Sequence, residues 1–176
     1  MSQRSGQPPG DSRPPAAAGV WLGVDVGSVR VGVARSDPRG VLAVPVVTLR
    51  RDARRFSDLD QLAQLVREYQ AVGVVVGLPR TLAGRDGPAV AAALAFGQAL
   101  GDRVAPVAVR FADERMTTVL AQRNLTSSGV RGRHQRAIVD QAAAVAILQS
   151  FLDDTRRSGP RPPARRATMN EHVSEQ

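Results

Sequence analysis

Apolar residues along the chain fall into two kinds of stretch, short β-branched runs and longer segments with helical spacing. The short runs predict strands at residues 20–26, 29–34, 41–49, 72–78 and 104–109. Only short turns separate the first three runs, which predicts an antiparallel meander. Pro45 places the third run at a sheet edge because proline cannot donate to a strand ladder. The run at 72–78 is wholly apolar and predicts a buried strand parallel to the first.

Helices are predicted at residues 56–70, 89–100, 117–125 and 136–154. The pattern Ser57-x-x-Asp60 is a helix-start signature, and Pro88 suits the first turn of the second helix. The resulting order predicts one α/β domain, with a mixed five-stranded sheet (an antiparallel meander, then βαβαβ) and helices on both faces. We expect this domain at residues 19–155, between disordered tails at 1–18 and 156–176.

The composition narrows the chemistry that the chain can perform. It has no cysteine, which excludes disulfides, thiol nucleophiles and iron–sulfur clusters, and its two histidines supply a zinc site or a catalytic triad poorly. The net charge is +8, every basic residue is arginine, and half of the excess lies before residue 19 or after residue 155. A polyanionic partner is predicted, with a basic surface kept for solubility as the alternative. No targeting signal or membrane span is evident, so we expect a cytoplasmic protein.

Asp25 is the most informative residue of the first strand. It lies in the middle of an apolar run with β-branched neighbours, where a carboxylate is costly unless it is hydrogen-bonded, paired with a cation or bound to a metal. Two interpretations stay open on this stretch alone. Asp25 either caps a turn or pairs with Arg30, or else it belongs to a site that other carboxylates complete.

Further acids occur where they could reach Asp25. Asp140 shares one face of the last helix with apolar residues that should pack on the sheet, although a local pair with Arg136 is an alternative. Asp113 and Glu114 end the fifth strand, where open α/β sheets bind ligands. We favour Glu114 as the ligand for its longer reach, and Asp113 as a capping or positioning group.

Acids that converge without cysteine or histidine suit Mg²⁺ or Mn²⁺, and a pair of such ions can hydrolyse phosphodiesters. Arginine suits phosphate because its planar fork binds two oxygens. The arginines expected near the acids are Arg80, Arg85, Arg131, Arg133 and Arg136.

Four segments together resemble the YqgF/RuvX family of small bacterial proteins. They are GVDVGSVRVGVARSD, VVVGLPRTLAGRDG, FADERMTT and IVDQAAAVAILQSFLD, and they span about residues 20–153. The resemblance implies an RNase H-like fold whose acids bind divalent metal, and by motif these acids are Asp25, Glu114 and Asp140. Arg30 and Arg115 lie within the segments and join the arginines expected to bind nucleic acid. The basic loop before the last helix departs from the family in having arginine and His134 without lysine.

The resemblance implies a metal-dependent nuclease of structured RNA or branched DNA. We favour 5′-end maturation of pre-16S rRNA, which needs a single site, over Holliday junction resolution, which needs a homodimer to cut two strands symmetrically. A non-cleaving nucleic-acid-binding factor is the alternative of another class. An actin-like phosphotransferase is disfavoured because that fold needs two such domains. The sequence leaves open the oligomeric state and any contribution of Asp37 or Asp113 to the site.

Overall fold

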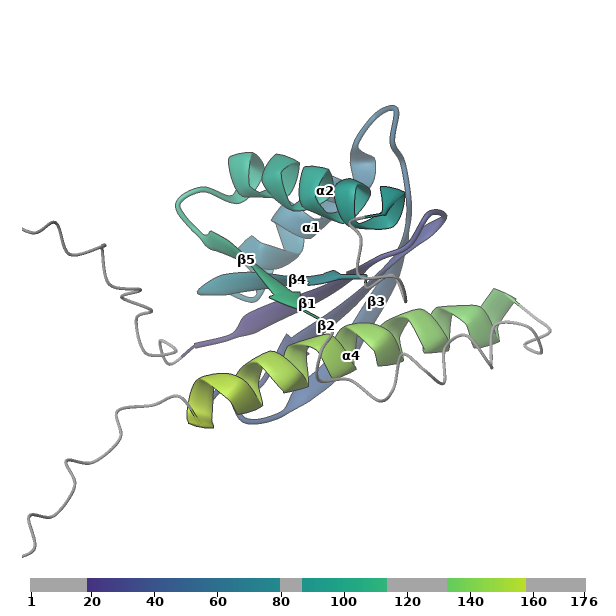
Figure 1. Cartoon of the computed structure of the whole chain (residues 1–176). Helices are drawn as coiled ribbons and strands as arrows, with labels where there is room; N and C mark the ends of the chain where they lie inside the picture. The colour runs from purple at the N-terminus through teal and green to yellow at the C-terminus, as the bar shows by residue number, and fades with distance from the viewer. Residues whose placement is uncertain (1–18, 80–86, 114–132, 158–176) are drawn as a thin grey trace, which may run out of the picture.

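The computed structural model describes residues 19–79, 87–113 and 133–157 (Figure 1). The strands are β1 (Trp21–Val26), β2 (Arg30–Ser36), β3 (Ala43–Arg50), β4 (Gly73–Leu78) and β5 (Ala108–Asp113). The helices are α1 (Ser57–Glu68), α2 (Pro88–Val104) and α4 (Arg133–Arg157). The described strands form one sheet in the order β3-β2-β1-β4-β5. β1, β2 and β3 pair antiparallel, whereas β4 pairs parallel to both β1 and β5. The predicted mixed α/β sheet is therefore confirmed.

Helices cover both faces of this sheet, as predicted. Figure 1 shows α1 and α2 together on one face and the long helix α4 on the other. Alternate residues of β1 serve the two layers, since Leu22 and Val24 pack with the α1–α2 side while Trp21 packs with α4. The sheet is thus the middle layer between two apolar cores. A residue's place in its strand decides which layer it faces.

Two glycines let α4 lie unusually close to the sheet. A Cβ on Gly23 would stand 2.6 Å from Cβ of Leu148, and one on Gly32 would overlap the carbonyl oxygen of Asp140. Neither position can hold a larger residue without moving the helix backbone. The apolar seam of α4, which includes Ala144 and Ile147, is buried against the strands as its helical spacing predicts.

Three local predictions need correction. The fifth strand is Ala108–Asp113 and not 104–109, because Val104 is buried as the last residue of α2 and Phe111 packs against Gly97 of that helix. The last helix begins three residues earlier and ends three residues later than expected, at Arg157, where Arg156 and Arg157 pair with acids one turn earlier.

The third correction concerns the start of α1. The helix begins at the predicted place, but Phe56 is the N-cap residue and no side chain caps the helix. The Ser57 hydroxyl instead donates to Asp52 in the preceding loop, with an oxygen–oxygen distance of 2.7 Å. None of the described helices has the length and hydrophobicity that crossing a bilayer requires.

Candidate functional site

The carboxyl ends of three parallel strands meet at one edge of the sheet. β1, β4 and β5 run in the same direction, so their last residues, Val26, Leu78 and Asp113, lie on the same side. α4 also starts there, because Asp140 of its early turns lies against β2 beside the end of β1. Ligands of open α/β sheets bind at such an edge. We call this region the carboxyl edge.

Asp25 is buried at the carboxyl edge, one residue before the end of β1. It is 5% exposed, and strand alternation puts its side chain on the same face as Trp21 and Gly23, which both contact α4. The sequence thus builds a strand that is apolar on the α1–α2 side and carries a carboxylate at its end on the α4 side. This position is as costly for a charge as the sequence indicated.

Asp140 lies beside Asp25, although the two are far apart in the sequence. Gly32 is the cross-strand partner of Asp25, and the space where its Cβ would stand is filled by the backbone of Asp140. Paired Cα atoms of antiparallel strands are about 4.5 to 5.5 Å apart. Two buried carboxylates therefore come from neighbouring positions on one face, since Asp140 is 8% exposed.

Arg30 of β2 forms an ion pair with Asp140. Its Nε lies 2.5 Å from Oδ2 of Asp140, and the two side chains are 29% and 11% exposed. The sequence left local pairings open, Asp25 with Arg30 and Asp140 with Arg136. The observed ion pair joins Arg30 to Asp140 instead, between the strand next to Asp25 and the helix that covers it.

The donor set of this site is made of carboxylate oxygens. Such hard donors suit Mg²⁺ or Mn²⁺, and the chain has no cysteine that would favour a softer ion. Within the described residues, no group of three acidic, histidine or cysteine side chains is placed to hold a metal. The third predicted ligand, Glu114, directly follows Asp113 in the sequence and lies outside the described residues. The chemistry of Asp25 and Asp140 fits a divalent cation.

A cavity of about 620 Å³ lies beside the ion pair, between the β2–β3 ladder and the start of α4. Its basic lining consists of Arg30, Arg50 and Arg136. The sequence predicted Arg30 and Arg136 as nucleic-acid-binding residues but missed Arg50. A signal was present, since Arg50 opens the run RRDARR, which places four arginines within six residues.

The other predicted site residues divide into two groups. Arg133 is the first residue of α4, about two helical turns before Asp140. Those outside the described residues are Arg80, Arg85, Glu114, Arg115 and Arg131. The expected helix at 117–125 and the tail residues 1–18 and 158–176 lie outside as well.

Asp37 does not belong to this site. It follows the end of β2, which runs antiparallel to β1, so it lies at the opposite edge of the sheet from Asp25. Its carboxylate accepts hydrogen bonds from the backbone N–H groups of Leu42 and Val41, at 2.8 and 2.7 Å. These bonds hold the pKa of Asp37 below its ordinary value of 3.8. The residue closes the β2–β3 loop.

Known proteins resemble the chain over almost all of the described part. Residues 19–154 match the family model described as RuvX, Holliday junction resolvase. A protein of Frankia casuarinae named "Putative pre-16S rRNA nuclease" is 60% identical over 139 residues, which cover 79% of this chain and 69% of that protein. A protein of the same name from Mycobacterium sp. (strain KMS) is 59% identical over 148 residues, covering 84% and 86% of the two chains.

A solved structure gives the same fold at much lower identity. T. thermophilus RuvC in complex with Holliday junction substrate superposes with a TM-score of 0.52 at 16% identity, over 79% of this chain and 96% of that one. The RNase H-like α/β fold predicted from the sequence is thereby confirmed. With the family match and relatives of about 60% identity, the chain belongs to the RuvX family.

Proposed function

We propose that the protein is a divalent-metal-dependent endonuclease that hydrolyses phosphodiester bonds in the 5′-end maturation of pre-16S rRNA, in the cytoplasm. The observation that carries this proposal is the burial of Asp25 and Asp140 on neighbouring positions at the carboxyl edge. Two buried carboxylates in one place are costly, and a bound cation would offset part of that cost in addition to the ion pair of Asp140 with Arg30. The printed names of the close relatives support the choice of substrate.

The residues have distinct roles in this proposal. Asp25, Asp140 and Glu114 hold Mg²⁺ or Mn²⁺. When bound, such ions supply an activated water and stabilise the leaving oxygen. Arg30 orients the carboxylate of Asp140 through their ion pair, since a charged hydrogen bond fixes which oxygen points into the site. The arginines that bind substrate phosphates are Arg30, Arg80, Arg85, Arg115, Arg131, Arg133 and Arg136.

Cleavage of a labelled 5′-extended 16S RNA fragment tests the proposal. The wild type is assayed with Mg²⁺, with Mn²⁺ and with a chelator in place of metal, next to Asp25→Asn. The Asn side chain keeps the size of Asp25 but loses the charge that binds a cation. We expect cleavage only by the wild type with metal. Circular dichroism is used to check that the variant is folded.

A labelled four-way DNA junction in the same assay distinguishes a second candidate. The family description, Holliday junction resolvase, favours this substrate. A two-fold junction requires a two-fold enzyme, so symmetric cuts by a homodimer in solution would assign the protein to DNA recombination. If wild type and Asp25→Asn bind both substrates equally and neither cuts, the nuclease proposal is wrong. The protein is then a nucleic-acid-binding factor.

A further inference from the structure

We propose that the cavity between β2, β3 and α4 is a binding site for one backbone phosphate of the nucleic acid, and that Arg50 is its principal residue. The inference rests on the proposed function in that the phosphate belongs to the substrate cut at the carboxyl edge. It adds Arg50, which the sequence analysis did not name, to the arginines expected to bind nucleic acid. The cavity is lined by Val29, Arg30, Thr48, Leu49, Arg50, Arg136 and Ala137.

The arrangement of Arg30 and Arg50 is the first argument. They are cross-strand partners in the β2–β3 ladder, so their side chains leave the sheet on the same face. Like charges directly opposite each other on a sheet are destabilising. Of these two, Arg30 alone pairs with a carboxylate among the described residues, that of Asp140. An anion between the two guanidinium groups would turn a repulsive pair into a binding site.

The pairing of arginines elsewhere is the second argument. Arg51, Arg103 and Arg156 each contact a carboxylate, with nitrogen–oxygen distances of 2.6 Å for Arg51 to Asp58 and 3.0 Å for Arg103 to Asp60. Within the part of the chain that the structure describes, neither Arg50 nor Arg136 has an ion pair. The cavity therefore brings together two arginines that have no acidic partner among the described residues.

The walls of the cavity are held in place by the fold. The Thr48 hydroxyl donates to the carbonyl of Ala137 at 2.9 Å, which ties the first turns of α4 to β3. On the strand side, the N–H of Arg51 donates to the carbonyl of Val29 at 2.9 Å. A cavity of about 620 Å³ with fixed walls can admit a phosphate together with its sugars. Because Arg30 also binds Asp140, the phosphate would lie next to the catalytic carboxylates.

Binding of nucleic acid without cleavage tests the site separately from the reaction. The labelled 5′-extended 16S RNA fragment and the four-way DNA junction are titrated with protein by fluorescence anisotropy, in chelator, at a series of salt concentrations. The variants are Arg50→Gln and the double variant Arg50→Gln/Arg136→Gln. The matched control is Arg67→Gln, an equal loss of charge at an exposed position in the last turn of α1, away from the cavity.

Each lost phosphate contact reduces the slope of log K against log [salt] by about 1. We expect Arg50→Gln to lower the slope by about 1. The double variant should weaken binding further with about the same slope, because both arginines serve one phosphate. Both effects should appear on RNA and DNA alike, because a phosphate contact carries no base information. Arg67→Gln should keep the wild-type slope. If Arg50→Gln behaves like Arg67→Gln, the inference is wrong even where the wild type cleaves. If the wild type cleaves nothing but the slopes differ as expected, the proposed function fails and the phosphate site stands.

Discussion

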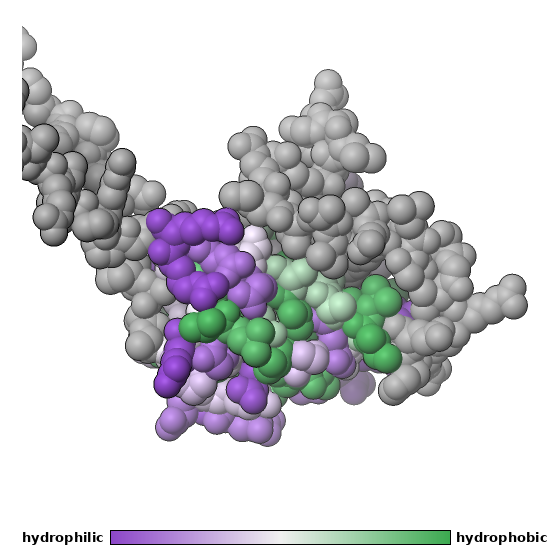
Figure 2. All heavy atoms as spheres, turned by 90° about the horizontal axis from the view of Figure 1, so that it is seen from below, coloured by the Kyte–Doolittle hydropathy of each residue, from purple (hydrophilic) through white to green (hydrophobic). Residues whose placement is uncertain are grey.

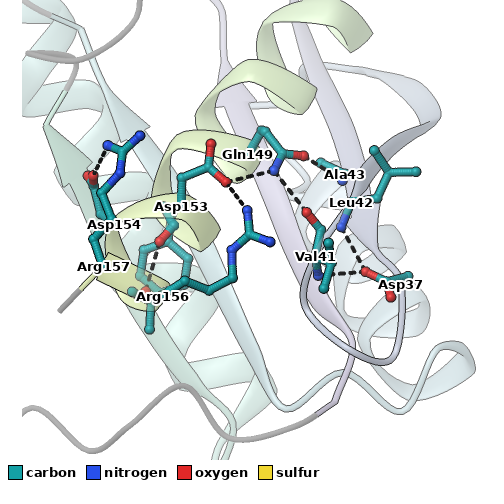
Figure 3. A network of polar contacts seen from close by, with 11 residues as sticks. Asp37, Val41, Leu42, Ala43, Gln149, Asp153, Asp154, Arg156 and Arg157 are labelled. Carbon is teal, nitrogen blue, oxygen red and sulfur yellow. Dashed lines mark hydrogen bonds and ion pairs between the residues drawn. The ribbon is translucent and has the colours of Figure 1, made fainter. Parts of the chain in front are cut away.

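The two ends of α4 handle charge in opposite ways. At its C-terminal end, Gln149 accepts a hydrogen bond from the N–H of Ala43 and donates to Val41 and Asp153 (Figure 3). Asp153 also pairs with Arg156, and these contacts, with that of Gln149 first, hold the pKa of Asp153 below its ordinary value. At the N-terminal end, Asp140 is buried beside Asp25, and the neighbouring cavity has an arginine excess.

The difference fits the proposed roles of the two ends, stability for the C-terminal end and ligand binding for the N-terminal end. Seen from below, the surface is hydrophilic around the C-terminal end of α4, at the left of the view. Hydrophobic side chains gather in the middle of the view (Figure 2). The hydrophilic end has its charges in contact with each other and with water, which costs little. The N-terminal end places the cavity arginines Arg50 and Arg136 near the buried Asp25 and Asp140. Local arrangements of charge that do not favour stability are typical of functional sites.

The largest expected effect comes from matched substitutions at the two ends of the helix. Asp140→Asn should reduce cleavage more than about 100-fold, since even groups that only support a metal ligand contribute about 10- to 100-fold. Asp153→Asn should leave the rate unchanged, because the polar contacts of Asp153 within the described residues are with Gln149 and Arg156 at the C-terminal end of α4. Both variants are assayed at saturating Mg²⁺ after their folding is checked. Equal loss in both would show that α4 acts as a whole rather than through its N-terminal end.

A second comparison uses glycines with different surroundings. Gly32→Ala should lower the unfolding free energy by about 1 to 3 kcal/mol, because the new methyl group overlaps backbone and not a flexible side chain. It should also reduce cleavage, since relief requires α4 to move away from Asp25. Gly101→Ala in α2 has room, with its nearest neighbour at 3.8 Å, and should stabilise the fold by about 0.5 to 1 kcal/mol. Urea unfolding measures the stability of both variants, and the cleavage assay measures their activity. If Gly32→Ala cleaves at the wild-type rate, the position of α4 does not determine catalysis.

At the C-terminal end of α4, we expect a substitution to change the stability of the protein but not its cleavage rate. Gln149→Ala removes the acceptor of the buried N–H of Ala43, which should cost about 1 to 2 kcal/mol of unfolding free energy. The cleavage rate per folded molecule should stay at the wild-type value because the contacts of Gln149 lie at the opposite edge of the sheet. If the cleavage rate falls at temperatures where the variant is fully folded, the C-terminal end of α4 also contributes to catalysis, and the comparison between the two ends is wrong.

The sequence predicted the fold and the buried acids because both depend on local patterns of apolar and polar residues. A carboxylate inside an apolar strand or on an apolar helix face is visible without a structure, which identified Asp25 and Asp140. The pair of Asp140 with Arg30 was not visible, because only the tertiary fold brings the two together. The fifth strand was misplaced since valines of a buried helix end and of a strand look alike. Arg50 was missed because its importance depends on the strand register that sets it opposite Arg30.

The smallest expected effect concerns Asp37, which closes the β2–β3 loop next to the contacts of Gln149 (Figure 3). Its pKa is lowered in the folded state, so its contribution to stability is present above pH 3.8 and is lost as the pH falls through the folded-state pKa. Asp37→Asn should therefore be less stable than the wild type at pH 7, and the two should converge as the solution is acidified below 3.8. Urea unfolding of both proteins across this range measures the difference. A difference that does not narrow would mean that the shape of the loop, and not the charge of Asp37, supplies the stability at this end of the molecule.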